Sequence, residues 1–287
     1  MRLIDYPVLY INLEKDKKRR IVLEKDLNNL DVSYQRIEAV YGKNLYDNKY
    51  RNRIAKILGV HQTKLHPDYW MDRHNFKSMS LNEKNILARV GCYLSHVVSV
   101  KYAYDNDYEK LMVLEDDACP LLNFYDEFPV PRDADMLYPG GYFIKQEDFN
   151  PDYQSSLIPI NTEEFKLAGT YSYILPNKKA IETVYKVLMS VFLQGKGHDK
   201  DPEWKSGKVR LRATNIDFMY INYFQKLGKT YVINPVRIAA REFESNITND
   251  RTDFKLSSFL NPEQQYDLVG IYDSYEGIYK LSDKKLL

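Results

Sequence analysis

The first forty residues contain two apolar, strand-forming runs separated by a stretch with helical spacing, and this order limits the possible folds more than any other part of the chain. Pro7–Leu13 is a short β-prone run with a proline at its edge. Four apolar residues of the polar stretch that follows roughly fit one helical face, namely Ile21, Leu23, Leu27 and Leu30. Ser33–Val40 then predicts a second strand. A strand, a helix and a strand in this order favour a sheet with parallel strands.

The rest of the chain continues the alternation of strands and helices. Apolar residues between Glu83 and Asn106 recur at helical spacing, and Lys110–Leu114 is an apolar run typical of a buried strand. Later elements are expected as a strand at Leu167–Leu175, a helix at Asn177–Ser190, a helix at Asn215–Leu227 and a strand at Tyr231–Asn234.

Gly91 lies inside the helix expected between Glu83 and Asn106, where a glycine destabilises the helix by about 1 kcal/mol relative to alanine. Either the close approach of another backbone or ligand, or tight packing of the helix on the sheet, would account for it.

Length and composition favour one large domain. A chain of 287 residues, of which 44% are hydrophobic, can bury a sizeable core. We expect a single mixed α/β domain over residues 1–250, with residues 43–82 as an insertion that holds a short helix near Asn52–Leu58. Residues 251–287 would form a C-terminal extension.

The near-zero net charge argues against partners that are attracted by a large net charge on the protein. The chain has 41 basic and 40 acidic side chains, so nucleic acid is not an expected partner. No uninterrupted apolar stretch is long enough to span a bilayer, and we expect a soluble protein of a bacterial cytoplasm or of the cytoplasm of a virus-infected host cell. Cys92 and Cys119 are too few for a disulfide framework and are interpreted as small buried hydrophobic residues.

Three adjacent carboxylates, Glu115, Asp116 and Asp117, follow the apolar run that ends at Leu114. Like charges at the end of a buried strand repel one another, so a positive group is expected nearby. Mg²⁺ and Mn²⁺ take oxygen ligands and often share them with substrate phosphates. If the extended conformation persists, Glu115 and Asp117 converge on a cation while Asp116 points elsewhere. The alternative is a solvated acidic turn.

Short motifs occur in a specific order along the chain. They are Tyr10-Ile11-Asn12-Leu13 with Arg19-Arg20, Arg36-Ile37-Glu38-Ala39 with Gly42, Gly91-Cys92-Tyr93-Leu94-Ser95-His96, and Val113-Leu114-Glu115-Asp116-Asp117. This order resembles glycosyltransferase family 25, which includes lipooligosaccharide β-galactosyltransferases and collagen galactosyltransferases. Weaker similarity continues through Gly169–Tyr173, Asn215–Asp217 and Glu244–Ile247.

The resemblance implies a GT-A type of fold, in which helices flank a mixed, mostly parallel central sheet. It also implies an inverting transfer from a UDP-sugar, with Mn²⁺ or Mg²⁺ held by Glu115 and Asp117. Galactose is the first expectation for the sugar and glucose the second. The acceptor would be a glycan, a glycolipid or a hydroxylated protein.

The same resemblance implies a set of residues that contact the donor: Asn12, Leu13, Arg19, Arg36, Ala39, Gly42, Ser95, His96 and Asp116. Arg36, Ala39 and Gly42 would line the pocket for uracil and ribose, and Ser95 and His96 would face the phosphates or the sugar. Two alternatives stay open: Lys15–Arg20 also fits a solvated helix face, and a helical histidine is often structural.

An inverting transfer needs a base that accepts the proton of the attacking hydroxyl. Asp217 is the predicted base, with Glu147, Asp148 and Asp199 as competitors. Because Asp217 lies in the first turn of a predicted helix, the helix dipole alone would also favour an acid there.

Two other functions compete with glycosyl transfer. A nucleotidyltransferase would normally have a glycine-rich phosphate loop after the first strand, and Asn12–Arg20 contains no glycine. A catalytically silent glycan-binding protein would share the fold, although the intact acidic motif argues against it.

Overall fold

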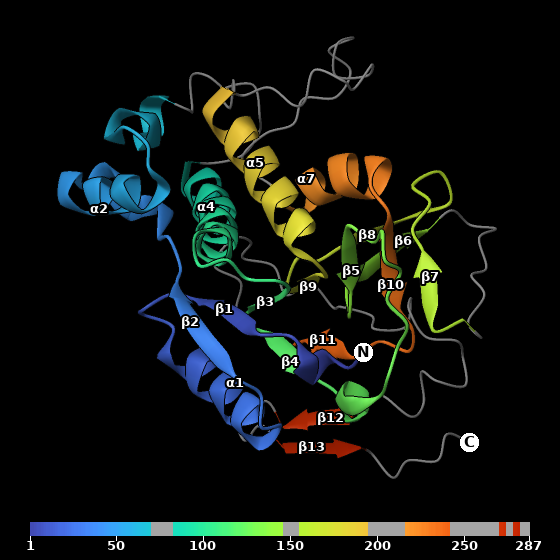
Figure 1. Ribbon diagram of the computed structural model, residues 1–287. Helices are drawn as coiled ribbons and strands as arrows, with labels where there is room; N and C mark the ends of the chain where they lie inside the picture. The colour runs from blue at the N-terminus through green and yellow to red at the C-terminus, as the bar shows by residue number, and fades with distance from the viewer. Residues whose placement is uncertain (70–82, 146–154, 195–215, 242–269, 274–277, 282–287) are drawn as a thin grey trace.

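A seven-stranded mixed sheet forms the centre of the protein (Figure 1). The computed structural model describes residues 1–69, 83–145, 155–194, 216–241, 270–273 and 278–281. The strands lie in the order β2 (Tyr34–Glu38), β1 (Val8–Asn12), β3 (Leu111–Glu115), β9 (Ser172–Leu175), β5 (Met136–Tyr138), β10 (Thr230–Ile233) and β7 (Leu157–Pro159).

Most strands of the sheet point in one direction. β1 is parallel to both β2 and β3, and β10 is parallel to β5. β9 runs antiparallel to β3 and to β5, and β7 runs antiparallel to β10. Five strands therefore share one direction and two oppose it. The expected mixed, mostly parallel sheet is confirmed, and it is consistent with the GT-A type.

Helices cover both faces of the sheet (Figure 1). α1 (Lys17–Asn29) lies on one side, and α4 (Glu83–Asp105) and α5 (Lys178–Gln194) pack beside each other on the other. The helices predicted at Glu83–Asn106 and Asn177–Ser190 are confirmed, and α5 extends four residues further.

Successive side chains of each buried strand point to opposite faces of the central sheet, so the apolar core has one part on each face. Leu9 and Ile11 of β1 pack in the cluster that includes α4 and α5, whereas Val8 and Tyr10 pack with Leu23 and Leu27 of α1. Because both faces are covered, β1 is buried along its whole length, which explains its continuous apolar sequence.

Gly91 of α4 lies against the backbone that follows β2. A Cβ atom on Gly91 would lie 2.5 Å from the carbonyl oxygen of Val40 and 2.8 Å from the amide nitrogen of Gly42. A Cβ atom on Gly42 would in turn lie 1.8 Å from the carbonyl oxygen of Leu87. Close backbone approach is therefore the reason for Gly91, and it brings the end of β2 next to the centre of α4.

The described part of the expected insertion packs as short helices near α4. They are a 3₁₀ helix at Gly42–Tyr46, α2 at Asn48–Leu58 and a 3₁₀ helix at Gln62–Leu65. The Asp47 side chain caps α2 by accepting a hydrogen bond from the Tyr50 amide at 2.7 Å, and Gly59 ends the helix with φ 69°. The predicted helix near Asn52–Leu58 is confirmed and begins four residues earlier.

The single strand predicted at Leu167–Leu175 is wrong, because the chain forms two strands there. β8 (Phe165–Ala168) pairs with β6 (Tyr142–Lys145) in a small sheet, and β9 joins the central sheet. Between them Gly169 adopts φ 90°, which few other residues tolerate, and this turn separates the strands.

The remaining elements complete the described fold. β4 (Ala118–Pro120) pairs with β11 (Ile238–Ala240), and β12 (Gly270–Asp273) pairs with β13 (Ile278–Leu281). A 3₁₀ helix at Leu3–Asp5 precedes β1, and another at Leu122–Tyr125 follows β4. The helix predicted from Asn215 is present as α7 (Ile216–Met219), which continues as a π-helix at Tyr220–Gln225. The predicted domain limit at residue 250 lies outside the described residues and stays a prediction.

Arg241, directly after β11, connects these outer elements to α1. Its backbone amide donates to the carbonyl of Asp117 at 2.7 Å, and its guanidinium donates to the carbonyl of Ala118. The guanidinium also forms a buried ion pair with Asp26 of α1. Through its backbone amide and its guanidinium, Arg241 therefore holds the acidic turn, β4 and α1 together.

Candidate active site

The three carboxylates lie where β3 ends. Glu115 is the last residue of β3, and Asp116 and Asp117 form the turn into β4. The extended conformation therefore stops one residue into the triplet. The three side chains still separate into different environments, which are described in turn.

Asp116 points toward the first strand and the first helix. It accepts hydrogen bonds from the Asn12 amide at 2.7 Å and from the Arg19 guanidinium at 2.9 Å. Burial raises the pKa of Asp116 in spite of these two favourable partners. Because Asn12 ends β1 and Arg19 lies in α1, these contacts join the carboxyl end of one strand to the next.

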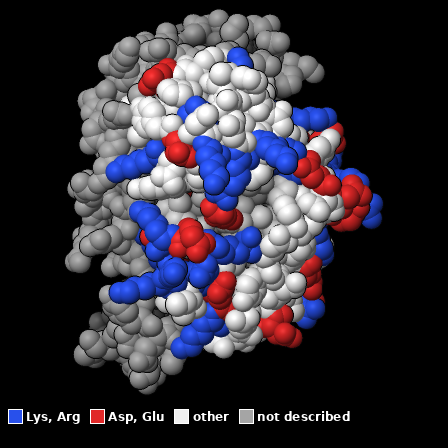
Figure 2. Space-filling model, turned by 90° about the vertical axis from the view of Figure 1, so that its left-hand side faces the viewer, with Lys and Arg blue, Asp and Glu red and all other residues white. Residues whose placement is uncertain are grey.

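Arg36 of β2 extends this polar network to the edge of the sheet. Its Nε donates to the Asn12 side-chain oxygen at 3.2 Å, and a terminal nitrogen donates to Glu14 at 2.7 Å. Figure 2 looks onto this side of the molecule, where Lys and Arg side chains gather with several acidic side chains among them. A groove of about 240 Å³ lies between β2, α2 and α4, and Arg36, Arg53 and Lys101 are among its lining residues.

Glu115 points away from Asp116, toward α4 and the turn before β9. Its Oε1 lies 3.3 Å from Nε2 of His96 and accepts a hydrogen bond from the Thr170 hydroxyl at 2.9 Å. Burial alone would raise the pKa of Glu115, but the hydrogen bond and charge of His96, with help from Thr170 and Arg19, lower it overall. Glu115 is therefore ionised and oriented.

Asp117 has the least compensated carboxyl group of the three. Its Oδ1 is buried and has no hydrogen-bond partner within the described part of the chain. Burial, together with the charges of Glu115 and Asp116, raises the pKa of Asp117 to about 8. Nearby positive charge comes from Arg19, and it does not offset these effects.

Asp217 lies close enough to this group for its charge to matter. Its Oδ1 accepts hydrogen bonds from the amides of Gly169 and Thr170, both at 3.0 Å. Burial and the charge of Glu115 raise the pKa of Asp217. Asp217 thus orients the turn that places the Thr170 hydroxyl on Glu115.

Four residues predicted to contact the donor also have contacts within the protein. Ser95 donates to the carbonyl of Gly91 at 2.6 Å and accepts from the Val40 amide at 2.8 Å, so it fixes the end of β2 on α4. The backbone amide of Ala39 donates to the Asn12 carbonyl at 3.0 Å, and the Ala39 side chain is buried. Gly42 is packed against Leu87, and Leu13 is a half-buried part of the apolar core. None of these contacts tests binding of a donor.

His96 is fully buried and belongs to an aromatic group. Its Nδ1 lies 3.1 Å from the Tyr173 hydroxyl, and the rings of Tyr173 and Tyr220 pack around it. Its position beside Glu115 gives this helical histidine a direct link to the acidic cluster.

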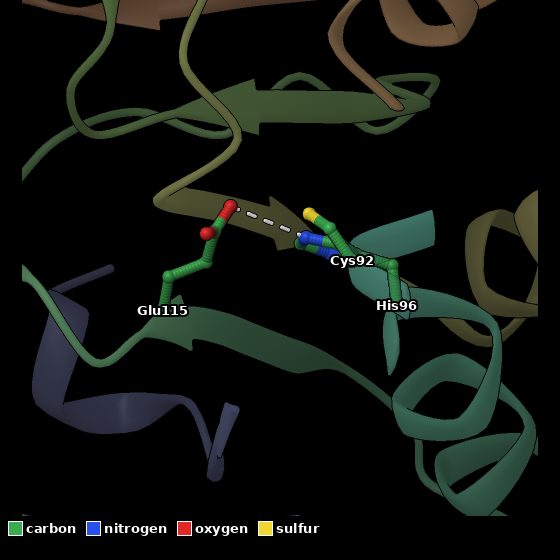
Figure 3. A group of neighbouring side chains, drawn as sticks. All are labelled: Cys92, His96 and Glu115. Atoms are coloured by element: carbon green, nitrogen blue, oxygen red, sulfur yellow. Dashed lines mark hydrogen bonds and ion pairs between the residues drawn. The ribbon is translucent and has the colours of Figure 1, made fainter. Parts of the chain in front are cut away.

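Two residues of the site carried no predicted role. Thr170 belongs to the Gly169–Tyr173 motif, but its contact with Glu115 depends on the turn that separates β8 from β9. Cys92 lies beside His96 and faces Glu115 (Figure 3). Cys92 and His96 are four residues apart, so both lie on one face of the helix. This spacing was the feature of the sequence that could have indicated that the two side chains are neighbours.

Several predicted residues lie outside the described ranges. They are the competing bases Glu147, Asp148 and Asp199, and the motif Glu244–Ile247. Among the helices that the structure describes, none has the length and apolar character needed to cross a bilayer.

Comparison with known proteins bears on the part of the chain that contains the acidic turn. Residues 6–129 match the model of the family described as glycosyltransferase family 25 (LPS biosynthesis protein). The resemblance inferred from the motifs is therefore confirmed over this family 25 segment, which includes β1, α1, β2, α4 and β3. The weaker motifs beyond residue 129 stay predictions.

The match over these residues supports glycosyl transfer as the general type of activity. One solved structure with similarity is titled "Crystal structure of a glycosyltransferase involved in the glycosylation of the major capsid of PBCV-1". It shares 10% sequence identity and has a TM-score of 0.34, covering 80% of this chain and 81% of that chain. No curated protein matches the sequence.

Proposed function

We propose that the protein is a metal-dependent, inverting glycosyltransferase that transfers a hexose from a UDP-sugar to a hydroxyl group. Galactose is the first candidate and glucose the second, and the acceptor is a glycan, a glycolipid or a hydroxylated protein. The observation that carries the proposal is the crowding of three carboxyl groups at the end of β3, in particular Oδ1 of Asp117, which is buried, has no hydrogen-bond partner among the described residues and belongs to a carboxyl group with a raised pKa. A divalent cation would supply the positive charge that this turn lacks and would let Asp117 ionise.

The residues present fit a hard cation. Glu115 and Asp117 offer carboxylate oxygens, and Glu115 is already oriented by Thr170. When bound, Mn²⁺ or Mg²⁺ would neutralise the diphosphate of the donor and its developing negative charge. Asp116 contributes indirectly, because it holds Asn12 and Arg19 at the side where a nucleotide would lie.

Asp217 is the candidate base of this proposal. Among the described residues, the amides of Gly169 and Thr170 both donate to Oδ1, so Oδ2 is the oxygen that would accept the proton of an acceptor hydroxyl. Its raised pKa suits this task, since a base works best when its pKa lies nearer the working pH.

Binding of UDP in the presence of Mn²⁺ tests the metal assignment. Asp117→Asn keeps the size of the side chain but removes its charge, and we expect UDP affinity with Mn²⁺ to fall about tenfold or more. The control is Asp133→Asn, because Asp133 is an exposed acid paired with Lys229. Calorimetric titration measures both variants. Unchanged affinity in a folded Asp117→Asn protein would contradict the proposal.

The donor sugar is tested by slow hydrolysis, which needs no acceptor. The full chain is incubated with UDP-galactose, UDP-glucose and other UDP-sugars, with and without Mn²⁺. We expect Mn²⁺-dependent release of UDP, fastest from UDP-galactose. Equal release with and without metal would argue against a metal-dependent transfer.

A further inference from the structure

Cys92, His96 and Glu115 form a compact group of three different metal-binding side chains. One ligand atom from each lies within 4.8 Å of the others. Cys92 and His96 project from the same face of α4, and Glu115 reaches them from the end of β3 (Figure 3). The sulfur and the imidazole both face the Glu115 carboxylate.

The hydrogen bonds of His96 allow its Nε2 to bind a cation. Nε2 faces Glu115 at 3.3 Å, and Nδ1 lies 3.1 Å from the Tyr173 hydroxyl. A tyrosine hydroxyl both donates and accepts, so it supports either neutral tautomer of the imidazole. A cation would take the place of the proton through which Nε2 hydrogen-bonds to Glu115. With the remaining proton on Nδ1, the lone pair of Nε2 and the carboxylate would both face that cation.

We propose that Cys92, His96 and Glu115 bind a thiophilic divalent cation, for which Zn²⁺ is the reference ion. A thiolate, a carboxylate and a neutral imidazole together carry two negative charges, which match a divalent ion. Three protein ligands with a fourth position open to water form a common zinc arrangement. This site differs from the proposed Mn²⁺ site because it contains the sulfur ligand, which Zn²⁺ prefers and hard cations do not.

The surroundings favour entry and binding of a cation. Cys92 and Glu115 are partly exposed, whereas His96 is fully buried, so an ion approaches from the side of the thiol and the carboxylate. Because the thiolate is the form that binds the metal, binding of Zn²⁺ would release the proton of the Cys92 thiol.

Glu115 belongs to both this group and the proposed Mn²⁺ site. Zn²⁺ bound by Cys92 and His96 would withdraw Glu115 from Mn²⁺, and it would therefore inhibit transfer. This consequence rests on the proposed function. The binding of Zn²⁺ itself does not, and it is measured without any donor or acceptor.

Co²⁺ replaces Zn²⁺ as a coloured probe of the sulfur ligand. Titration of the metal-free full chain with Co²⁺ should give a thiolate-to-cobalt charge-transfer band in the near ultraviolet. Cys92→Ser should lose this band, and Cys119→Ser, at the other cysteine of the chain, should keep it. The proposal is overturned if the unmodified protein gives no such band or if Cys92→Ser retains it, and the first of these outcomes needs no variant to fold.

The affinity for Zn²⁺ gives a second measurement. In competition with a coloured chelator, Cys92→Ser and His96→Gln should each weaken Zn²⁺ binding by about tenfold or more. Asp117→Asn should leave Zn²⁺ affinity close to that of the unmodified protein while losing Mn²⁺-dependent UDP binding. If Asp117→Asn keeps Mn²⁺-dependent UDP binding, the result counts against the proposed function alone. If a folded Cys92→Ser protein binds Zn²⁺ as tightly as the unmodified protein, the result counts against the zinc site alone.

Discussion

Asp217 shows how one carboxylate can serve structure and chemistry together. It holds the amides of Gly169 and Thr170, and through Thr170 it helps to position Glu115. A role in the turn and a role as base predict different results for two substitutions at this position.

Asp217→Ala removes the acceptor of two amide groups, and we expect it to destabilise the protein by about 2–4 kcal/mol. Asp217→Asn retains a side-chain oxygen for both amides and should cost about 1 kcal/mol or less. Urea unfolding measures both. Equal stability of the two variants would show that these hydrogen bonds contribute little.

Turnover of Asp217→Asn separates the base from the structural role. If Asp217 accepts the proton, transfer should fall on the order of 10²-fold or more while binding of donor and metal persists. Near-normal turnover in this variant would leave Asp217 with its role in the turn only, and would direct the search for the base to Glu147, Asp148 and Asp199.

At the scale of elements, the contact between α4 and the end of β2 depends on two glycines. Gly91 and Gly42 let the backbones approach more closely than any Cβ atom allows. This contact also places Ser95 on the Val40 amide, and it holds the helix that carries Cys92 and His96.

Gly91→Ala should destabilise the protein by about 2 kcal/mol or more, since backbone atoms 2.5 and 2.8 Å from the new Cβ would have to move. The matched comparison is Gly59→Ala, where the Cβ meets no atom within 4 Å but φ is 69°. That change should cost about 1 kcal/mol. Thermal unfolding compares them, and an effect at Gly91 no larger than at Gly59 would contradict the packing argument.

The elements that could be predicted from the sequence are those whose apolar residues have a clear period. β1, β3, α4 and α5 bury continuous or helical apolar patterns, and each was located from them. The break at Gly169 could not be predicted, because the strand-like residues on both sides form one apolar run and the turn is fixed by Asp217, 48 residues away. β4 and β11 are three residues each, too short for a period to appear.

In the candidate site, too, some features could be predicted from the sequence and others depend on long-range contacts. The acidic triplet was located because three like charges at the end of a buried strand repel one another and need a positive group nearby. The partners of each carboxylate could not be read from the sequence, since they depend on long-range contacts such as Asn12 to Asp116, 104 residues apart. Cys92 was interpreted as a hydrophobic residue because the sequence alone does not place Glu115 opposite it.

At the scale of the whole molecule, the acidic site makes stability depend on pH. The folded-state pKa of Asp117 is about 8, against an ordinary value of 3.8. Glu115, Asp116 and Arg19 are the charged groups that act most strongly on it, and Asp217 and the Cys92 thiol lie in the same group. The folded protein therefore holds a proton that the unfolded chain releases between these two pH values, so folding loses stability as the pH rises through this window.

Asp117→Asn removes this titration. In EDTA, its stability relative to the unmodified protein should increase from pH 6 to pH 8, by up to about 1 kcal/mol per pH unit. Urea unfolding at both pH values measures the difference, and Asp133→Asn serves as the exposed control. A constant difference between Asp117→Asn and the unmodified protein would show that Asp117 is already ionised at pH 6.

The Arg241–Asp26 ion pair has a consequence for the order in which the chain matures during synthesis. These residues are separated by 215 positions, so α1 leaves the ribosome long before the guanidinium that pairs with it. A buried carboxylate without its ionic partner is costly, which disfavours final docking of α1 on the unfinished sheet. The carbonyls of Asp117 and Ala118 also receive their Arg241 partner only then. The nascent protein therefore completes the support of its acidic turn only after residue 241 has been synthesised, and a ribosome stalled before that residue would hold a chain without a finished site.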